Sequence, residues 1–358
     1  MITSNYKNMS EETSNEKISN QEIIDSMLVS SRSIVRTCME IRNHEDVLIV
    51  TDTETSEIGR SLYEAASEVT DRVLLIMMPP MFKLGNEPPS PVADLMRRVR
   101  VVLIATKDSL THTKARINAS KAGVRIASMP GIDKNMFISG GITADYNALL
   151  REISAMNTIF RRRRDVHITS PSGTDVKFTT GSRWILEDNG ICNRPGQVTN
   201  LPAGRIFVLP KKGSMNGKII FDGSWEGKLL EDNIEFTIVD GLVTDVKGDS
   251  EINNFFKLDK NNTRTSGGGL INTVAEFGFG MNSRARLVGN KLEDQVVRGN
   301  SYFSFGDNTA LGGNSNIGLQ VRGVVQKTSI YLEDIDLALD GKIIAKKICY
   351  GSHFIADY

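Results

Sequence analysis

Two kinds of hydrophobic pattern alternate from Glu22 to about residue 170. Apolar residues recur at helical spacing in four segments. These segments are Ile23–Met39, Ile58–Val69, Thr113–Ala122 and Tyr146–Phe160. Between them lie the short apolar runs Val47–Val50, Val73–Met77, Val101–Ile104 and Val124–Ala127. Since buried runs that alternate with helices are typical of a parallel sheet covered on both faces, this region predicts an α/β domain.

The pattern changes after His167, where apolar and polar residues alternate and Gly, Asp and Asn interrupt the runs. The segment IDLALDGKII predicts a hairpin on Asp340 and Gly341. We therefore expect a tail over residues 1–21, an α/β domain over 22–165 and an α+β, mostly antiparallel β domain over 166–358. The proline-rich segment Pro79–Val92 is long enough to be a lid or an oligomer contact.

The composition of the chain limits which partners it can bind and indicates its cellular compartment. The chain has 43 Lys and Arg residues against 43 Asp and Glu residues, which disfavours nucleic acid and membrane surfaces as partners. Its three cysteines form no CxxC pair, and no 18-residue apolar run occurs. The polar N-terminus lacks the apolar core of a signal peptide. These features predict a cytoplasmic protein.

The segment Phe305–Gly323, FGDNTALGGNSNIGLQVRG, has the glycine-rich composition of a ligand-binding loop. It contains no histidine or cysteine, and Asp307 is its one carboxylate. Cys192 has no histidine at a helpful place in the sequence, so we expect an ordinary buried thiol there rather than a nucleophile.

Five stretches, taken in order, resemble one superfamily: the leucyl aminopeptidase T metallopeptidases and the related 2,5-dihydroxypyridine 5,6-dioxygenases. They are Ser109–Ile132, Ile168–Phe178, Asn200–Pro210, Ala275–Asp294 and Phe305–Gly313. The resemblance covers nearly everything after the tail. It implies an α/β N-terminal domain, a β-rich C-terminal domain that carries the site, and a homo-oligomer, a dimer or higher.

The resemblance also implies a metal, but this chain departs from the family's ligand set. A glutamate in a segment like NLPAGEV is here Arg205, whereas the glutamate of AELG is kept as Glu276. The histidine of HIALGDN is Tyr302, and the His-x-Asp pair falls on Gln320 and Arg322. The dioxygenase members resemble this pattern and hold one iron with two histidines and an aspartate.

Arginine repels a divalent cation and cannot lose its proton to become a ligand. Glu276 is the one anionic ligand that remains. One carboxylate is too few for a dinuclear metal site and binds even a single ion poorly. The sequence therefore predicts no family-type metal and no other cofactor.

The same positions suit a small anionic molecule. Arg205 and Arg322 could hold a carboxylate or phosphate bidentately, with Gln320, Asp307 and Asn308 as further binding residues. Glu276 is the candidate general base, and Tyr302 is the candidate hydrogen-bond or proton donor. In the opposing interpretation, Arg205, Glu276 and Arg322 form a buried salt-bridge network that fills a former metal cavity.

We therefore expect an enzyme repurposed for metal-independent C–N hydrolysis or rearrangement on a small anionic substrate. One alternative is a metal-dependent aminopeptidase or Fe(II) ring-cleaving dioxygenase with altered ligands. The other is a non-catalytic binding or partner subunit.

Overall fold

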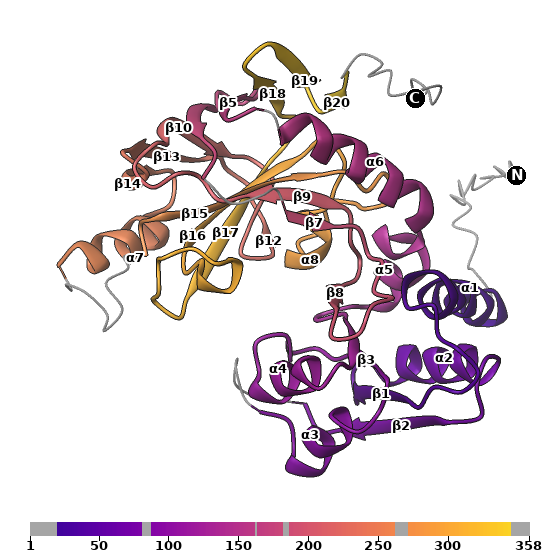
Figure 1. The fold of residues 1–358 in the computed structure, drawn as a ribbon. Helices are drawn as coiled ribbons and strands as arrows, with labels where there is room; N and C mark the ends of the chain where they lie inside the picture. Colours follow the sequence, from indigo (N-terminus) through magenta and orange to yellow (C-terminus); the bar gives the residue numbers. More distant parts are fainter. Residues whose placement is uncertain (1–19, 81–86, 162, 182–185, 262–270, 345–358) are drawn as a thin grey trace, which may run out of the picture.

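The computed structural model describes residues 20–80, 87–161, 163–181, 186–261 and 271–344. The predicted tail, apart from its last two residues, and part of the proline-rich segment lie outside these ranges. The parallel sheet and the antiparallel sheets occupy opposite ends of the molecule (Figure 1). No helix among the described residues is long and apolar enough to cross a membrane.

The N-terminal part forms a five-stranded parallel sheet in the order β2-β1-β3-β4-β8. Its strands are β1 (Val47–Asp52), β2 (Val73–Met78), β3 (Val101–Ala105), β4 (Arg125–Ser128) and β8 (Val198–Asn200). Its helices are α1 (Asn20–Ser33), α2 (Ser56–Ser67), α3 (Ser90–Met96), α4 (Lys114–Lys121), α5 (Lys134–Ser139) and α6 (Tyr146–Phe160). The predicted α/β fold and its four strands are confirmed.

Alternate residues of the central strands enter different cores. Leu103 of β3 belongs to the large core shared with the rest of the chain, whereas its neighbours Val102 and Ile104 pack in a second core on the other face. A continuous apolar run is thus buried on both sides. The prediction that Val73–Met77 is a buried strand is wrong: Leu74 is 50% and Met77 58% exposed. The reason is that β2 is an edge strand.

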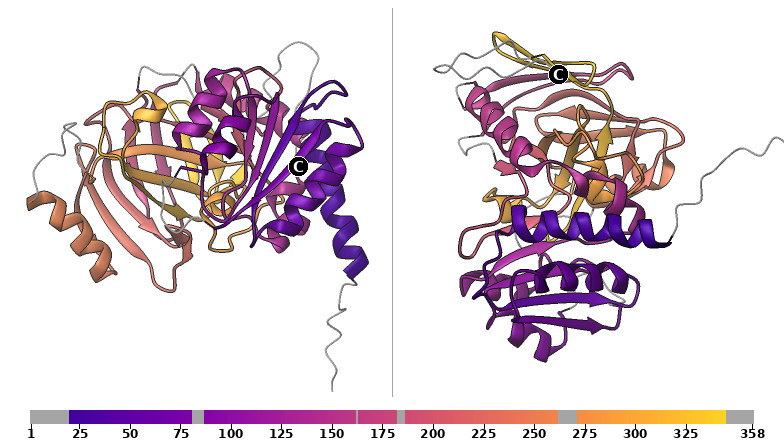
Figure 2. Two further views of the ribbon diagram at one scale, coloured as in Figure 1. Left: turned by 90° about the horizontal axis from the view of Figure 1, so that it is seen from below. Right: turned by 90° about the vertical axis from the view of Figure 1, so that its right-hand side faces the viewer.

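The C-terminal part contains two antiparallel sheets (Figure 2). The larger has the order β14-β13-β10-β6-β5-β18-β19-β20. Its strands are β5 (Asp165–Thr169), β6 (Asp175–Thr179), β10 (Asn216–Phe221), β13 (Ile234–Val239), β14 (Leu242–Lys247), β18 (Ser329–Leu332), β19 (Ile335–Leu339) and β20 (Lys342–Ile343). The predicted hairpin joins β19 to β20, with positive φ angles at Asp340 and Gly341.

The second antiparallel sheet, of seven strands, has the order β12-β11-β17-β16-β15-β9-β7. Its strands are β7 (Leu186–Asp188), β9 (Arg205–Val208), β11 (Ser224–Trp225), β12 (Lys228–Leu229), β15 (Val274–Gly280), β16 (Ser301–Gly306) and β17 (Gln320–Val325). The helices of this part are α7 (Ser250–Asn261) and α8 (Lys291–Asp294).

The sheets do not follow the expected division near residue 165 strictly. Strand β8 comes after that position, yet it pairs in parallel with β4 through Ile126 and Val198. The chain thus returns to the first sheet before it enters β9. The domain boundary itself stays a prediction.

Candidate functional site

The candidate site lies on one face of the seven-stranded sheet, where β9, β15, β16 and β17 are neighbours. Side chains of a strand alternate between faces. In β15, Phe277 and Phe279 enter the large core, so Glu276 and Gly278 face the other way. By the same alternation, Tyr302 lies on the sheet face opposite to that of Phe303, and Arg322 on the face opposite to that of Val321. Five sequence-predicted residues therefore meet on this face: Arg205, Glu276, Tyr302, Gln320 and Arg322.

Glycine makes room for the tyrosine. A Cβ atom at Gly278 would lie 2.1 Å from Cε1 of Tyr302, far inside van der Waals contact. The Tyr302 ring, which is fully buried, packs directly over this residue, in a small cluster with Phe207 and Val324. Its position places the hydroxyl between Arg205 and Glu276.

Arg205 is buried and has acidic partners. Its Nε donates to Oδ2 of Asp188 at 3.1 Å, and its Nη1 lies 3.9 Å from Oε1 of Glu276. Nη1 also donates to the Tyr302 hydroxyl at 2.8 Å and to Oε1 of Gln295 at 2.6 Å. The Tyr302 hydroxyl in turn donates to Glu276. This guanidinium is neutralised within the protein.

The pKa values of the buried groups follow from this pairing. Burial alone would lower the pKa of Arg205, but Tyr302, Asp188 and Glu276 outweigh it and hold that pKa above its usual range. Burial raises the pKa of Asp188, and the charge of Arg205 opposes this rise only in part. Burial is also the main reason that the pKa of Tyr302 is well above its ordinary value. Tyr302 is thus a neutral donor at physiological pH.

Arg322 differs from Arg205 in both exposure and partners. It is half-buried, and its guanidinium donates to the amide oxygens of Gln295 and Gln320, the second at 2.5 Å. Its Cζ lies 5.7 Å from the centroid of the Tyr302 ring. Among the described residues, the ion pairs include Arg205 but not Arg322. The positively charged guanidinium of Arg322 is therefore hydrogen-bonded to neutral groups.

Asp307 and Asn308 hold the glycine-rich loop in shape. Asp307 accepts backbone hydrogen bonds from Thr309, Ile317 and Gly318, whereas Asn308 accepts one from Ser315. The backbone oxygen of Asp307 accepts from Nε2 of Gln320 at 3.1 Å. Their side-chain oxygens thus bind the loop, and their predicted role in substrate binding stays a prediction.

Sequence reasoning missed Asp188 and Gln295, the partners of the arginines. Asp188 ends the short strand β7, which has no clear alternating pattern. Gln295 directly follows α8 and comes one residue after the family-like stretch that ends at Asp294. Its position next to that stretch was the one sequence signal that could have identified Gln295. Cys192 is buried as expected, and burial raises the pKa of its thiol to about 11, which disfavours a nucleophile.

His112 belongs to the α/β part but responds to the charges of this site. Desolvation by the surrounding protein lowers its pKa, and the positive charges of Arg116 and Arg322 lower it further, whereas Asp307 opposes them. The charge of Arg322 thus acts on a side chain of the α/β part.

We expect the pKa of His112, measured by NMR titration, to lie below its usual 6.5. Arg322→Gln removes a positive charge that disfavours the imidazolium, so the His112 pKa should rise in this variant. The control is Arg163→Gln, whose guanidinium pairs with Asp334 elsewhere. An unchanged His112 pKa in Arg322→Gln would show that the two side chains do not interact.

The fold and the site define a class: an α/β domain joined to a β-rich part whose strand-borne cluster contains two arginines. The family model described as 2,5-dihydroxypyridine 5,6-dioxygenase matches residues 28–345, and the chain belongs to this family. The resemblance to the 2,5-dihydroxypyridine 5,6-dioxygenases is thereby confirmed.

Individual relatives agree with this membership. The chain is 24% identical over 214 residues to the 2,5-dihydroxypyridine 5,6-dioxygenase of Pseudomonas putida KT2440. The match spans 54% of this chain and 58% of that protein. The solved structure of the dioxygenase from the same organism has a TM-score of 0.73 at 18% identity, over 92% of this chain and 98% of the other. Wild-type AmpT from Thermus thermophilus has a TM-score of 0.63 at 15% identity, over 90% and 99%. The two structures show the shared fold.

The donor set does not fit the iron that the family resemblance implies. Iron in a two-histidine, one-carboxylate site requires those three side chains to converge. Within the described ranges, no three His, Cys, Asp or Glu side chains converge in a way that could hold a metal ion. The two guanidiniums and the neutral tyrosine stand where the resemblance would place ligands.

Proposed function

We propose that this chain binds a small carboxylate-bearing molecule through Arg322, without a family-type metal. The observation that carries the proposal is the contrast between the two arginines. Arg205 is buried against Asp188 and Glu276, whereas Arg322 is half-buried and is held by the amides of Gln295 and Gln320. A guanidinium that is held in position but not neutralised can donate hydrogen bonds to a bound carboxylate.

The surroundings of Arg322 favour a ligand with an apolar body. Tyr302, Phe207 and Val324 form an apolar cluster beside the guanidinium, and Leu287 and Leu311 pack against that cluster. Amide groups can reorient, so Gln320 could donate its Nε2 to a bound carboxylate. Tyr302 and Val324 are buried, so the partly exposed Leu287 and Leu311 are the apolar surface that supports a ligand with an apolar body.

The finer hypothesis is metal-independent C–N hydrolysis or rearrangement, with Glu276 as the base and Tyr302 as the proton donor. It is supported by the direct hydrogen bond from the Tyr302 hydroxyl to Glu276. However, both groups are buried and already paired with Arg205 and Gln320. Catalysis would thus require the ligand to displace Gln320. The alternative of a non-catalytic binding subunit is supported by the same buried pairing.

Titration calorimetry with benzoate and its neutral isostere benzamide tests the binding proposal. We expect benzoate to bind and benzamide to bind at least tenfold more weakly, because a hydrogen bond to a charged group is worth about 1.5–3 kcal/mol. Arg322→Gln should weaken benzoate binding by a similar factor and leave the fold intact. Arg163→Gln is the matched control. The proposal would be contradicted if benzoate and benzamide bound equally well. It would also be contradicted if Arg322→Gln and Arg163→Gln bound benzoate equally well.

The oligomeric state and the cytoplasmic location also stay predictions. Family resemblance supports a homo-oligomer, and light scattering on the purified protein measures it. The ring-cleaving dioxygenase alternative is supported by the family match over residues 28–345. Elemental analysis separates it from the proposal, since it requires a stoichiometric metal.

A further inference from the structure

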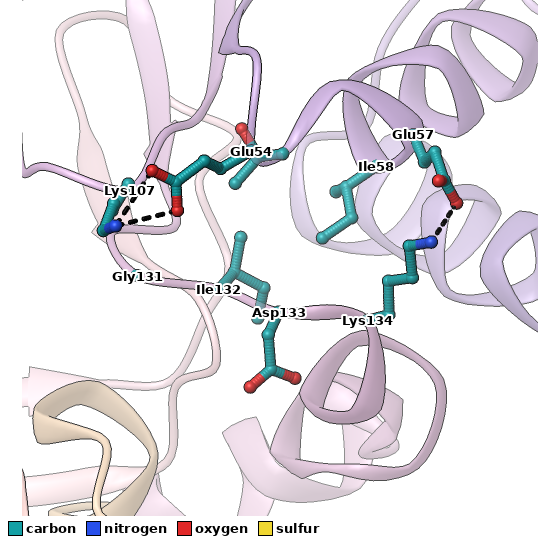
Figure 3. A pocket seen from close by; sticks show the side chains of 9 residues that line it. Glu54, Glu57, Ile58, Lys107, Gly131, Ile132, Asp133 and Lys134 are labelled. Atoms are coloured by element: carbon teal, nitrogen blue, oxygen red, sulfur yellow. Dashed lines mark hydrogen bonds and ion pairs between the residues drawn. The ribbon is translucent and has the colours of Figure 1, made fainter. Parts of the chain in front are cut away.

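A cavity lies away from the arginine cluster, at the carboxyl edge of the parallel sheet. Its volume is about 360 Å³. It is lined by Glu54, Thr55, Glu57 and Ile58 after β1, by Lys107 after β3, and by residues 131–134 after β4. Segments from three neighbouring strands therefore converge on it (Figure 3).

The topology of the sheet makes this edge a preferred place for a ligand. The order β2-β1-β3-β4 shows that the chain moves from β1 to β2 on one side and then returns to place β3 on the other side. Open α/β sheets bind ligands outside the carboxyl ends of the strands at such a switch point. The cavity lies at the ends of β1 and β3, where this reversal occurs.

The wall of the cavity is fixed by backbone hydrogen bonds. Oδ1 of Asp52 accepts from the backbone nitrogens of Glu54 and Thr55, and Oδ2 accepts from that of Lys107. The Thr55 hydroxyl donates to the backbone oxygen of Ala105 at 2.5 Å. The loops after β1 and β3 are thus held together by one buried carboxylate. The cavity is preformed.

Charged pairs and apolar side chains alternate across the cavity. Lys107 contacts Glu54 at 2.8 Å on one side, and Lys134 contacts Glu57 at 2.6 Å on the other. Ile58 and Ile132, both nearly buried, lie between the two pairs (Figure 3). The side chains of both ion pairs are about half exposed, so a ligand can open either pair at little cost.

This arrangement selects ligands that carry both charges. An ion of one sign is attracted by one member of each pair and repelled by the other. A zwitterion can open the Lys107–Glu54 pair and place its carboxylate at Lys107 and its ammonium at Glu54, while its side chain lies in the cavity that Ile58 and Ile132 line. We propose that this cavity binds a small zwitterion with an apolar side chain, of the α-amino acid class.

Three matched probes test the proposal by titration calorimetry on the full chain carrying Arg322→Gln, which removes the proposed carboxylate site: L-valine, 3-methylbutanoate and 2-methylpropan-1-amine. The second lacks the ammonium group of valine, and the third lacks its carboxylate. We expect valine to bind about tenfold or more tightly than either, because each charged contact contributes. Equal binding of all three, or no binding of valine at millimolar concentration, would overturn the proposal.

Variants of the lining residues test whether valine binds in this cavity. Lys107→Met and Glu54→Gln should each weaken valine binding about tenfold or more, because each removes one charge-assisted contact. The control is Lys218→Met, whose ammonium pairs with Glu235 on the antiparallel sheet at similar exposure. All three substitutions are made in the Arg322→Gln chain, so the result is independent of the proposed carboxylate site. Valine bound equally by Lys107→Met, Glu54→Gln and the control would refute the assignment.

Discussion

Replacing Arg205 with methionine is expected to lower the free energy of unfolding by about 3–5 kcal/mol. Glu276 is buried, the Asp188 side chain is only 12% exposed, and Arg205 forms an ion pair with each of them. Methionine fills part of the space but leaves two carboxylates without a counter-charge. Urea denaturation at pH 7, followed by circular dichroism, measures the change.

The loss of folding stability in Arg205→Met should depend on pH. Burial already raises the pKa of Asp188, and removing Arg205 removes the charge that opposes this rise. The variant can therefore protonate Asp188 on acidification and so avoid an unpaired buried charge. We expect the deficit against the wild type to shrink as the pH falls from 8 to 5. A deficit that is independent of pH would show that lost packing, not charge, causes it.

Arg322→Met is the matched control for Arg205→Met. Its guanidinium is bonded to neutral amides, so its loss should cost about 1 kcal/mol or less. Equal destabilisation by the two variants would contradict the division between a structural and a ligand-binding arginine. Benzoate should raise the thermal midpoint of Arg163→Gln but not that of Arg322→Met.

Phe305→Ala is expected to cost about 3–5 kcal/mol of folding free energy, the usual range for a buried phenylalanine. Phe305 is fully buried, and its ring centroid lies 5.2 Å from that of Phe236 and 5.7 Å from that of Phe256. It also precedes the glycine-rich loop directly. The variant should thus unfold at lower urea concentration and bind benzoate more weakly.

Phe255→Ala provides the comparison for the aromatic cluster. Phe255 contacts the Phe256 ring at 5.3 Å but is 37% exposed, so its removal should cost about 1 kcal/mol or less. If Phe305→Ala costs no more than Phe255→Ala, the packing of Phe305 is not what holds this part of the core.

The periodicity of the sequence was sufficient for much of the fold. Helical spacing predicted α6 at Tyr146–Phe160, the bounds that the structure has. Strict alternation in β15 and β16 is consistent with Glu276 and Tyr302 sharing the face opposite the phenylalanines. Such patterns are local: they report which side of an element is buried, because burial follows the period of the backbone.

The tertiary structure decided which elements meet and which charges are paired. Alternation along one strand contains no information about its neighbours, so the return of β8 to the parallel sheet and the exposure of β2 were not visible beforehand. The same holds for Asp188 and Gln295, which reach the arginines from β7 and from the end of α8. The sequence by itself has arginines at two positions where the family resemblance implies metal ligands. Only the three-dimensional pairing decided that Arg205 is neutralised and Arg322 is not, because the charge of a buried group depends on partners distant in the chain.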